Sequence, residues 1–367
     1  MPKAVIMGSR NGADIKLVET ERRSESHLTP IEPLEAPSGI LAAVGGTPLV
    51  EFNRLYHPSN FRVFAKLEAL NPGGSIKDRP AKAIVSQEIR AGRIVPGRTT
   101  IVESTSGNMG VGLAQVCKYY GVDLICVVDP KTPRPILSVL RTYGAQVDIV
   151  TNLDSETEEY LPSRLRRVQE LLDELSDGYW PDQYSNTLNA AAHVNTIREI
   201  INVLGTVDYV FCATSTCGTL RGFFEYLSES GLTTELVAVD AAGSAIFGNP
   251  ACRRLIPGHG ATIVPELYRP DLADAVVHVT DRESLIGCRM LLGREAYLAG
   301  GSSGAVAAGV AKYAHRIRHG ATCVIILPDR GERYVDTIYD GSWVAQHFGG
   351  LREEEISWSS LERAGTC

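Results

Sequence analysis

The sequence predicts an α/β fold with two open domains and mainly parallel sheets. Short apolar runs such as Leu124–Val128 alternate with longer helix-like stretches, which is the pattern of parallel α/β sheets. Loops rich in glycine, serine and threonine separate several of these runs from the following helix. The chain has 367 residues, with 44% hydrophobic and 22% charged residues, which is typical of a globular protein with one large or two medium-sized domains.

Periodicity and turn residues predict the elements in chain order. The expected strands are Phe61–Leu67, Thr100–Glu103, Asp123–Val128, Gln146–Val150, Tyr209–Ala213, Glu235–Asp240 and Thr322–Leu327. The expected helices are Asp78–Ala91, Gly107–Tyr120, Pro133–Tyr143, Val168–Leu175, Ala190–Val203, Thr219–Glu229, Ser284–Ala296 and Gly304–Arg318. Residues 1–37 are polar and indicate an N-terminal extension, and residues 346–367 indicate a charged, peripheral C-terminal tail.

Composition excludes several classes of function. The net charge of −7 leaves no basic surplus for a nucleic-acid backbone, so we expect no nucleic-acid partner. The longest apolar stretches fall far short of the ~20 residues that a membrane span needs, and the first residues are too weakly apolar for a signal peptide. The eight cysteines are scattered without metal-ligand spacing, so we expect no metal site and reduced thiols in a cytoplasmic protein.

Lys77 is the first candidate catalytic residue. It lies between the turn-forming Asn71-Pro72-Gly73-Gly74 and the helix expected from Asp78, with Ser75 as a candidate cap. A lysine held in such a place can lose its proton and form a Schiff base. A lysine in a polar turn is more often a solvated surface residue, so Lys77 carries weight only together with the loops downstream.

Several of those loops precede helices and offer hydroxyl and N–H groups to anions. They are Ser104-Thr105-Ser106-Gly107-Asn108-Met109-Gly110, Asp182-Gln183-Tyr184-Ser185-Asn186, Ser215-Thr216-Cys217-Gly218-Thr219 and Gly300-Gly301-Ser302-Ser303-Gly304-Ala305. The loop at 215–219 lacks the Gly-Lys-Ser/Thr of a Walker loop. Each loop taken alone is also compatible with an ordinary turn or helix cap.

Taken together, the order of these motifs resembles the fold-type II pyridoxal-phosphate (PLP) enzymes, in the branch of cysteine synthases and cystathionine β-synthases. Further motifs are similar to that family, namely Gly45-Gly46-Thr47-Pro48-Leu49, Ile256-Pro257-Gly258-His259-Gly260-Ala261 and Pro328-Asp329-Arg330-Gly331-Glu332-Arg333-Tyr334. The resemblance runs from about residue 38 to residue 345. It implies a homodimer in which PLP lies in a cleft between a large domain (38–79 plus 186–345) and a small, mobile substrate-binding domain (80–185).

The resemblance also implies a role for each motif. Lys77 would form the Schiff base with PLP, Asn108 would hydrogen-bond the phenolic oxygen, and Ser302 would face the pyridine nitrogen. The phosphate would be held by Ser215, Thr216, Cys217, Gly218 and Thr219. The amino-acid substrate would be bound by Thr105, Ser106, Gly107, Gln183 and Tyr184. A serine hydroxyl at the ring nitrogen leaves the ring largely unprotonated, which favours β-elimination chemistry over transamination.

Departures from the family pattern bear on the second substrate. Ser215 and Cys217 replace glycines, and Met109 and Tyr184 replace the usual threonine and phenylalanine. The stretch Asp240–Gly248, together with Lys77–Ala81 and Ser106–Gly110, is similar to the siderophore-pathway branch, the N-(2-amino-2-carboxyethyl)-L-glutamate synthases, which make a precursor of 2,3-diaminopropionate. That resemblance implies a transferase that joins O-phospho-L-serine to L-glutamate.

Two other functions remain open from the sequence. A cysteine synthase would use sulfide with O-acetylserine or O-phosphoserine, and a catalytically silent scaffold would keep the fold without the chemistry. Glutamate and phosphoserine are both anionic, so their sites require arginine or many N–H donors. Arg253 and Arg254 are candidates, although a solvated basic pair fits them equally well.

Overall fold

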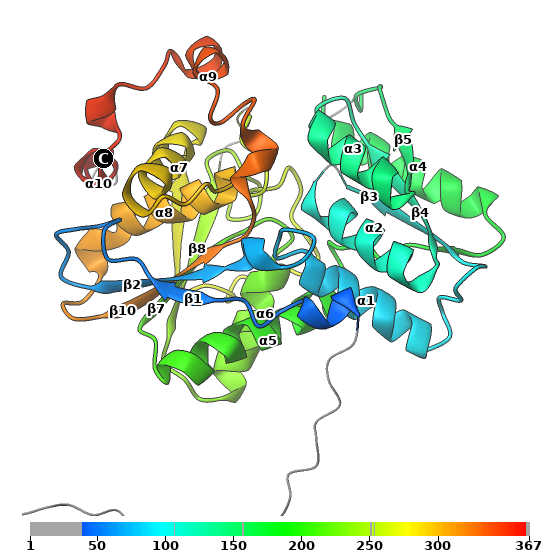
Figure 1. Ribbon diagram of the computed structural model, residues 1–367, viewed down its shortest axis with the longest axis horizontal. Coiled ribbons are helices and arrows are strands. Elements are labelled where there is room, and N and C mark those ends of the chain that lie inside the picture. Colours follow the sequence, from blue (N-terminus) through cyan, green and yellow to red (C-terminus); the bar gives the residue numbers. More distant parts are fainter. Residues whose placement is uncertain (1–38, 106, 156–157, 250–251, 253, 365–367) are drawn as a thin grey trace, which may run out of the picture. The chain divides into compact units, whose positions relative to one another are not determined.

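Two sheets of mainly parallel strands organise the chain (Figure 1). This computed structural model describes residues 39–105, 107–155, 158–249, 252 and 254–364. The larger sheet has the order β1 (Leu49–Glu51), β2 (Arg62–Leu67), β10 (Thr322–Leu327), β7 (Tyr209–Ala213), β8 (Glu235–Ala241) and β9 (Ala275–Val279), and only β1 pairs antiparallel there. The smaller sheet is wholly parallel, in the order β5 (Gln146–Ile149), β4 (Asp123–Val128), β3 (Thr100–Ser104) and β6 (Gly178–Tyr179).

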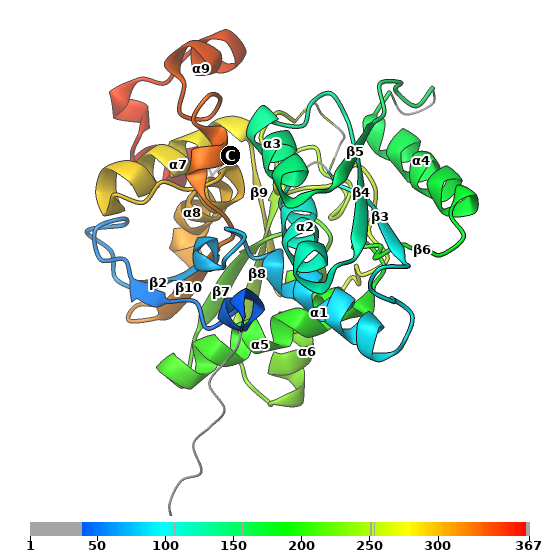
Figure 2. The same cartoon turned by 45° about the vertical axis from the view of Figure 1, so that its right-hand side comes forward.

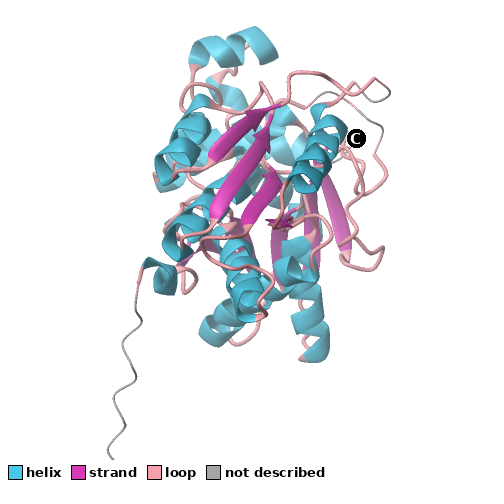
Figure 3. Ribbon diagram, turned by 90° about the vertical axis from the view of Figure 1, so that its right-hand side faces the viewer, coloured by secondary structure: helices cyan, strands magenta, loops and turns pink. Residues whose placement is uncertain are grey.

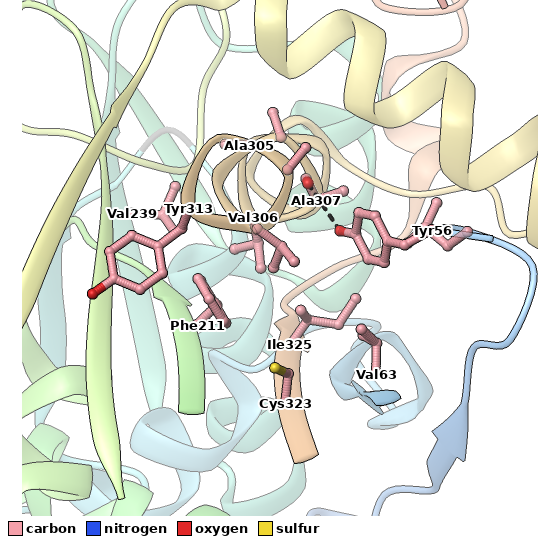
Figure 4. Close-up of a cluster of buried hydrophobic side chains, with 14 of the residues drawn as sticks. Tyr56, Val63, Phe211, Val239, Ala305, Val306, Ala307, Tyr313, Cys323 and Ile325 are labelled. Atoms are coloured by element: carbon pink, nitrogen blue, oxygen red, sulfur yellow. Dashed lines mark hydrogen bonds between the residues drawn. The ribbon is translucent and has the colours of Figure 1, made fainter. Parts of the chain in front are cut away.

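Helices cover both faces of the larger sheet, as parallel strands require. α7 (Asp281–Glu295) and α8 (Gly301–Tyr313) pack on one face, and α5 (Thr187–Leu204) and α6 (Gly218–Glu229) pack on the other. Small residues of α8 lie directly over the strands, so that Ala305 and Val306 meet Phe211 and Ile325 in the core (Figure 4). The hydroxyl of Tyr56 closes this core by donating to the carbonyl of Ala307 at 2.8 Å.

The smaller sheet is also covered on both faces (Figure 2). α1 (Asp78–Arg90), α2 (Asn108–Tyr120) and α3 (Arg134–Tyr143) contribute to the core on one face, and α4 (Tyr160–Glu174) packs on the other. α1 also lies against α5, so it connects the helices of both sheets. Figure 3 shows the strands of both sheets from the side of the smaller one.

Short elements complete the described chain. They are the 3₁₀ helices η1 (Ile40–Ala43), η2 (Glu68–Leu70), η3 (Ala314–Arg316), η4 (Gly331–Tyr334) and η5 (Glu353–Glu355), and the helices α9 (Gly341–Phe348) and α10 (Trp358–Ala364). Within the described part of the chain, no helix is long and apolar enough to cross a membrane.

The prediction of mainly parallel α/β sheets is confirmed, and every expected strand is present within a residue or so of its expected bounds. The strands of the larger sheet fall within 38–79 and 186–345, and those of the smaller sheet fall within 80–185. The predicted fold class of two α/β domains is confirmed. The bounds of the domains and the mobility of the smaller one stay predictions. Residues 1–37 lie outside the described residues.

The predicted start of the helix at Val168–Leu175 is wrong, because α4 begins earlier, at Tyr160. Its first turns carry Ser163 and Arg164, which are polar yet buried, so the stretch lacks the apolar pattern of a core helix. The helix expected at Gly304–Arg318 starts earlier, at Gly301, and its regular part ends at Tyr313. Ser302 therefore lies in the first turn of α8 and not in a loop ahead of it. The short strands β1, β6 and β9 and the helices α9 and α10 were not expected.

The C-terminal segment is not simply peripheral. α10 contacts α8, and Leu361 is buried in the core of the larger sheet. The ring of Trp358 packs edge-on against Tyr56, with ring centroids 4.7 Å apart, and also contacts Phe61. The charges that suggested a peripheral tail occupy the exposed residues of the segment, such as Arg352 and Glu354.

Replacing Leu361 by alanine should therefore lower the free energy of unfolding by about 2–5 kcal/mol, because it opens a cavity beneath α10. Chemical denaturation followed by far-UV circular dichroism measures the loss. Ser359→Ala, at an exposed position of the same helix, is the matched control and should change stability by less than about 0.5 kcal/mol. Equal stabilities of Leu361→Ala and the parent protein would show that α10 does not contribute to the core.

Candidate active site

The expected site residues follow the carboxyl ends of parallel strands, where open α/β sheets usually bind ligands. In the larger sheet, the chain after β2 leads to Lys77, the chain after β7 gives Ser215–Thr219, and the chain after β10 gives Asp329. In the smaller sheet, Thr105–Asn108 follow β3 and Gln183 follows β6. A short antiparallel bridge between Ser75 and Asp329 brings two of these segments side by side.

Lys77 is held by its backbone at the start of α1. The turn before it requires Gly74 at φ 86, a left-handed conformation that favours glycine. The hydroxyl of Ser75 accepts from the Lys77 N–H at 3.2 Å, so it holds the backbone of the lysine itself. The sequence predicted Ser75 as a cap of α1, but its side chain does not cap the first turn of that helix. Burial lowers the pKa of the Lys77 amine, and the nearby Asp329 opposes that shift. The amine has no hydrogen-bond partner among the described residues.

The 215–219 loop lines the same pocket as Lys77, together with Gly258. Cys217 adopts φ 64 at the start of α6, a conformation that a glycine would adopt without strain. A Cβ at Gly218 would lie 2.4 Å from Oδ1 of Asn189, so any larger residue there would displace that buried side chain. The N–H groups of Ser215, Thr216 and Cys217 have no partner in the described part of the chain, so they are available to an anionic group beside Lys77.

The loop after β3 is partly used by the protein itself. The Thr105 hydroxyl accepts from Gly110 N–H at 3.0 Å and from Gly107 N–H at 3.4 Å, so it caps α2. Ser106, predicted to bind substrate, lies outside the described residues. Gly107 is half-buried at the start of α2, and the Asn108 N–H has no partner among the residues described.

The Asn108 side chain is oriented by two residues that the sequence analysis gave no role. Its amide donates to Oδ2 of Asp329 at 2.7 Å, and its carbonyl oxygen accepts from Arg333. Arg333 also donates to the carbonyl of Gly73, and Tyr334 donates to Asp329 at 2.6 Å. The Pro328–Tyr334 motif was noted in the sequence, but nothing in it shows that Asp329 would reach Asn108 from the other sheet.

Gln183 and Tyr184 approach the site from the smaller sheet. The Gln183 amide donates to the carbonyl of Ser104 at 3.3 Å. Asn189 links this loop to the 215–219 loop, since its amide donates both to the Gln183 carbonyl at 2.8 Å and to the Thr216 hydroxyl at 3.1 Å. Burial raises the pKa of the Tyr184 phenol, so Tyr184 is a hydrogen-bonding and not an ionised group.

Ser302 faces the same region from α8. It is almost completely buried, and a Cβ on Gly258 would lie 3.3 Å from its hydroxyl oxygen. Gly258 also lines the pocket of Lys77 and the 215–219 loop, so Ser302 lies next to a residue of that pocket. Among the described residues, no group of three or more His, Cys, Asp and Glu side chains is placed to hold a metal ion.

The family model for pyridoxal-phosphate dependent enzymes matches residues 40–329. The chain belongs to this family. It is therefore a PLP-dependent enzyme. This match confirms the family that the order of the motifs predicted.

Solved structures of the same fold are similar over nearly their whole length. O-acetyl serine sulfhydrylase isoform 3 from Entamoeba histolytica is 31% identical with a TM-score of 0.78, and the match covers 91% of this chain and 98% of that one. The O-acetylserine dependent cystathionine beta-synthase from Helicobacter pylori is 30% identical with a TM-score of 0.77, and the match covers 83% of this chain and 99% of that one. O-ureido-L-serine synthase is 27% identical with a TM-score of 0.76, covering 89% and 100%.

Glu103 is a buried carboxylic acid beneath this site. It lies on β3, is almost inaccessible to water, and contacts the loop that carries Gln183. Burial, followed by the negative charge of Asp182, raises the pKa of Glu103 to about 8. Its carboxyl group is therefore mostly protonated at neutral pH and can donate a hydrogen bond.

This shift predicts how stability depends on pH. The folded protein binds the Glu103 proton more tightly than the unfolded chain does, so this group stabilises the fold at low pH. Its contribution is lost between the ordinary glutamate pKa and about 8, at up to about 1.4 kcal/mol per pH unit. Glu103→Gln, which is neutral at every pH, should flatten the measured unfolding free energy over this window. Glu353→Gln, at an exposed carboxylate, should retain the parent profile.

Proposed function

We propose that this PLP-dependent β-replacement enzyme joins O-phospho-L-serine to L-glutamate. The products are N-(2-amino-2-carboxyethyl)-L-glutamate and phosphate, a step toward the L-2,3-diaminopropionate of siderophore biosynthesis. The observation that carries the proposal is a cleft of about 520 Å³ in which Tyr184 lies with two guanidinium groups, those of Arg164 and Arg254.

The cofactor roles are part of the proposal. Lys77 attaches PLP, and the unpartnered N–H groups of Ser215, Thr216 and Cys217, with Gly218 and Thr219, hold its phosphate. Asn108 keeps one amide N–H beyond its bond to Asp329, and this N–H is assigned to the phenolic oxygen. Ser302 is assigned to the ring nitrogen. These groups fit PLP because an amine of lowered pKa and a set of N–H donors without partners line one pocket.

The cleft supports anionic substrates. Arg164 is largely buried, and its nearest carboxylate is Asp129, at 3.5 Å from Nε. Its Nε and Nη1 have no hydrogen-bond partner among the described residues, and a buried guanidinium in that state favours binding an anion. Arg254 donates to the carbonyl of His259 at 3.1 Å and keeps further N–H groups. Arg253, the other arginine expected from the sequence, lies outside the described residues.

The residues divide the chemistry as follows. PLP, when bound, supplies the electron sink that acidifies the α-carbon. The amine of Lys77, whose pKa is lowered by burial, removes the Cα proton in its neutral form. Phosphate leaves Cβ with the bonding electron pair, and the deprotonated amino group of glutamate forms the new bond to Cβ. Lys77 then returns a proton to Cα. Thr105, Ser106, Gly107 and Gln183 are assigned to the substrate α-carboxylate.

A cysteine synthase remains the alternative. It is supported by the similar solved structures that are O-acetylserine-dependent or act as O-acetyl serine sulfhydrylases. Sulfide is small and carries no carboxylate, so it leaves the arginines of the Tyr184 cleft without an obvious task. A homodimer, and closure of the 80–185 domain over the substrate, belong to the same proposal.

Turnover with each nucleophile separates the two functions. The holoenzyme with O-phosphoserine should release phosphate about tenfold or more faster with glutamate than with sulfide, because glutamate, unlike sulfide, carries carboxylates that the arginine-lined cleft can bind beside the donor phosphate. Phosphate release and mass spectrometry of the amino-acid product measure the outcome. Lys77→Arg is the control and should show neither turnover nor the visible absorption of lysine-bound PLP. Faster turnover with sulfide would establish the cysteine synthase instead.

Arg164→Gln should distinguish an anion-binding arginine from a structural one. It should lower kcat/KM for O-phosphoserine by about 10–100-fold, mostly through KM, because one charge-assisted contact to the substrate is lost. O-Acetylserine has no charge on its leaving group, so its kcat/KM should fall much less. Arg166→Gln is the matched control, because Arg166 lies on the same helix and pairs with Asp154 away from the cleft residues. Equal losses with both donors would contradict a phosphate-binding role.

A further inference from the structure

A second cleft, of about 410 Å³, opens between α1, α5 and the loop at residues 44–46. None of its lining residues lines the pocket of Lys77 or the cleft of Tyr184. Lys82 and the buried Ser86 line it from α1, and Glu199 lines it from α5. The more exposed lining residues are Arg90, Asn195, Arg198 and Asn202.

Arg79 lines the cleft and is paired with Glu199, but Lys82, Arg90 and Arg198 have no carboxylate within ion-pair distance among the described residues. Lys82 is half-buried, and it has no carboxylate partner among the described residues. Within the described part of the chain, the Arg90 side chain donates only to the neutral Gln87, at 3.2 Å. Arg198 donates to the neutral Asn195 at 2.7 Å, and its guanidinium lies over the ring of Tyr226.

The one carboxylate that lines the cleft is already occupied. Glu199 accepts from Lys66 at 2.6 Å and from Arg79 at 2.7 Å, and it also accepts from the Gly46 N–H at 3.0 Å. These bonds outweigh the effect of its burial and hold the pKa of Glu199 at about 2. Glu199 therefore stays ionised but has little capacity left to pair with Lys82 or Arg198.

The pKa of Lys82 responds to the positive charge around it. Burial lowers the pKa of its amine, and the positive charge of Arg79 lowers it further. A bound anion would relieve this repulsion and would gain charge-assisted hydrogen bonds from cations that lack them. The amides of Asn195 and Asn202 and the Ser86 hydroxyl add neutral donors around the same space.

We propose that this cleft is a binding site for a small organic polyanion that carries carboxylate or phosphate groups, held by Lys82, Arg90 and Arg198. Its volume is in the range of small-molecule sites in proteins. The site is separate from the catalytic pocket, so the inference does not depend on which nucleophile the enzyme uses. The same helix nonetheless links the cleft to Lys77, because α1 begins directly after that lysine and carries Lys82.

Binding to the PLP-loaded enzyme tests the proposal with citrate and inorganic phosphate as probes. Isothermal titration calorimetry should show saturable binding of at least one probe. The double variant Lys82→Gln/Arg198→Gln should weaken that binding about tenfold or more, because it removes two charged donors. The control Lys118→Gln/Arg294→Gln makes the same change in net charge at exposed positions outside the cleft and should bind as the parent does.

Chemical labelling of the parent protein provides a readout that requires no variant to fold. An amine-acylating reagent should modify Lys82 faster than Lys118, because a lysine of lowered pKa is more often neutral. Saturating probe should slow labelling of Lys82 and leave Lys118 unaffected, as measured by mass spectrometry of tryptic peptides.

Each outcome decides the question. Binding of citrate alone or phosphate alone, if Lys82→Gln/Arg198→Gln weakens it, supports the site and identifies the group it prefers. Absence of saturable binding, equal weakening in both double variants, or unprotected labelling of Lys82 would overturn the proposal. None of these readouts requires turnover, so failure of the proposed reaction would not be mistaken for failure of this site.

Discussion

The position of Lys77 depends on a buried ion-pair network behind it. The guanidinium of Arg79 donates to Glu68 at 2.7 and 2.8 Å and to Glu199 at 2.7 Å, and Glu68 is fully buried. Glu68 also accepts from Thr47 and from Asn71, which begins the turn before Lys77. The network therefore ties that turn to α1 and α5. Loss of Arg79 would leave the fully buried Glu68 without a cationic partner among the described residues, which is why such networks permit little rearrangement.

A second set of polar contacts joins the two sheets at the same place. Asp329 follows a strand of the larger sheet, and Asn108 follows a strand of the smaller one, yet their side chains bond directly. Burial raises the pKa of Asp329, and it raises that of Asp78 to about 7. Such buried acids reduce stability, and their concentration around one lysine is characteristic of a site organised for chemistry.

Local charge in this protein differs from its overall charge. The chain has a net charge of −7, yet the cleft of Tyr184 contains two guanidinium groups and the cleft between α1 and α5 contains cations without carboxylate partners. Net charge describes long-range attraction and solubility, whereas affinity for a small anion depends on donors within hydrogen-bond distance. An acidic protein can therefore present two sites suited to anionic metabolites.

Local sequence by itself determined most of the strands, the turn before Lys77 and the motifs at the ends of the strands, because apolar periodicity and turn chemistry act over a few residues. It also identified the family, because several motifs occur in a fixed order. It did not find α4 at its full length, since Arg164 faces a cleft and interrupts the apolar pattern. Only the tertiary structure decided that Asp329 and Arg333 orient Asn108, because those contacts join residues far apart in the chain, and hydrogen bonds between distant side chains leave no periodic trace in a sequence.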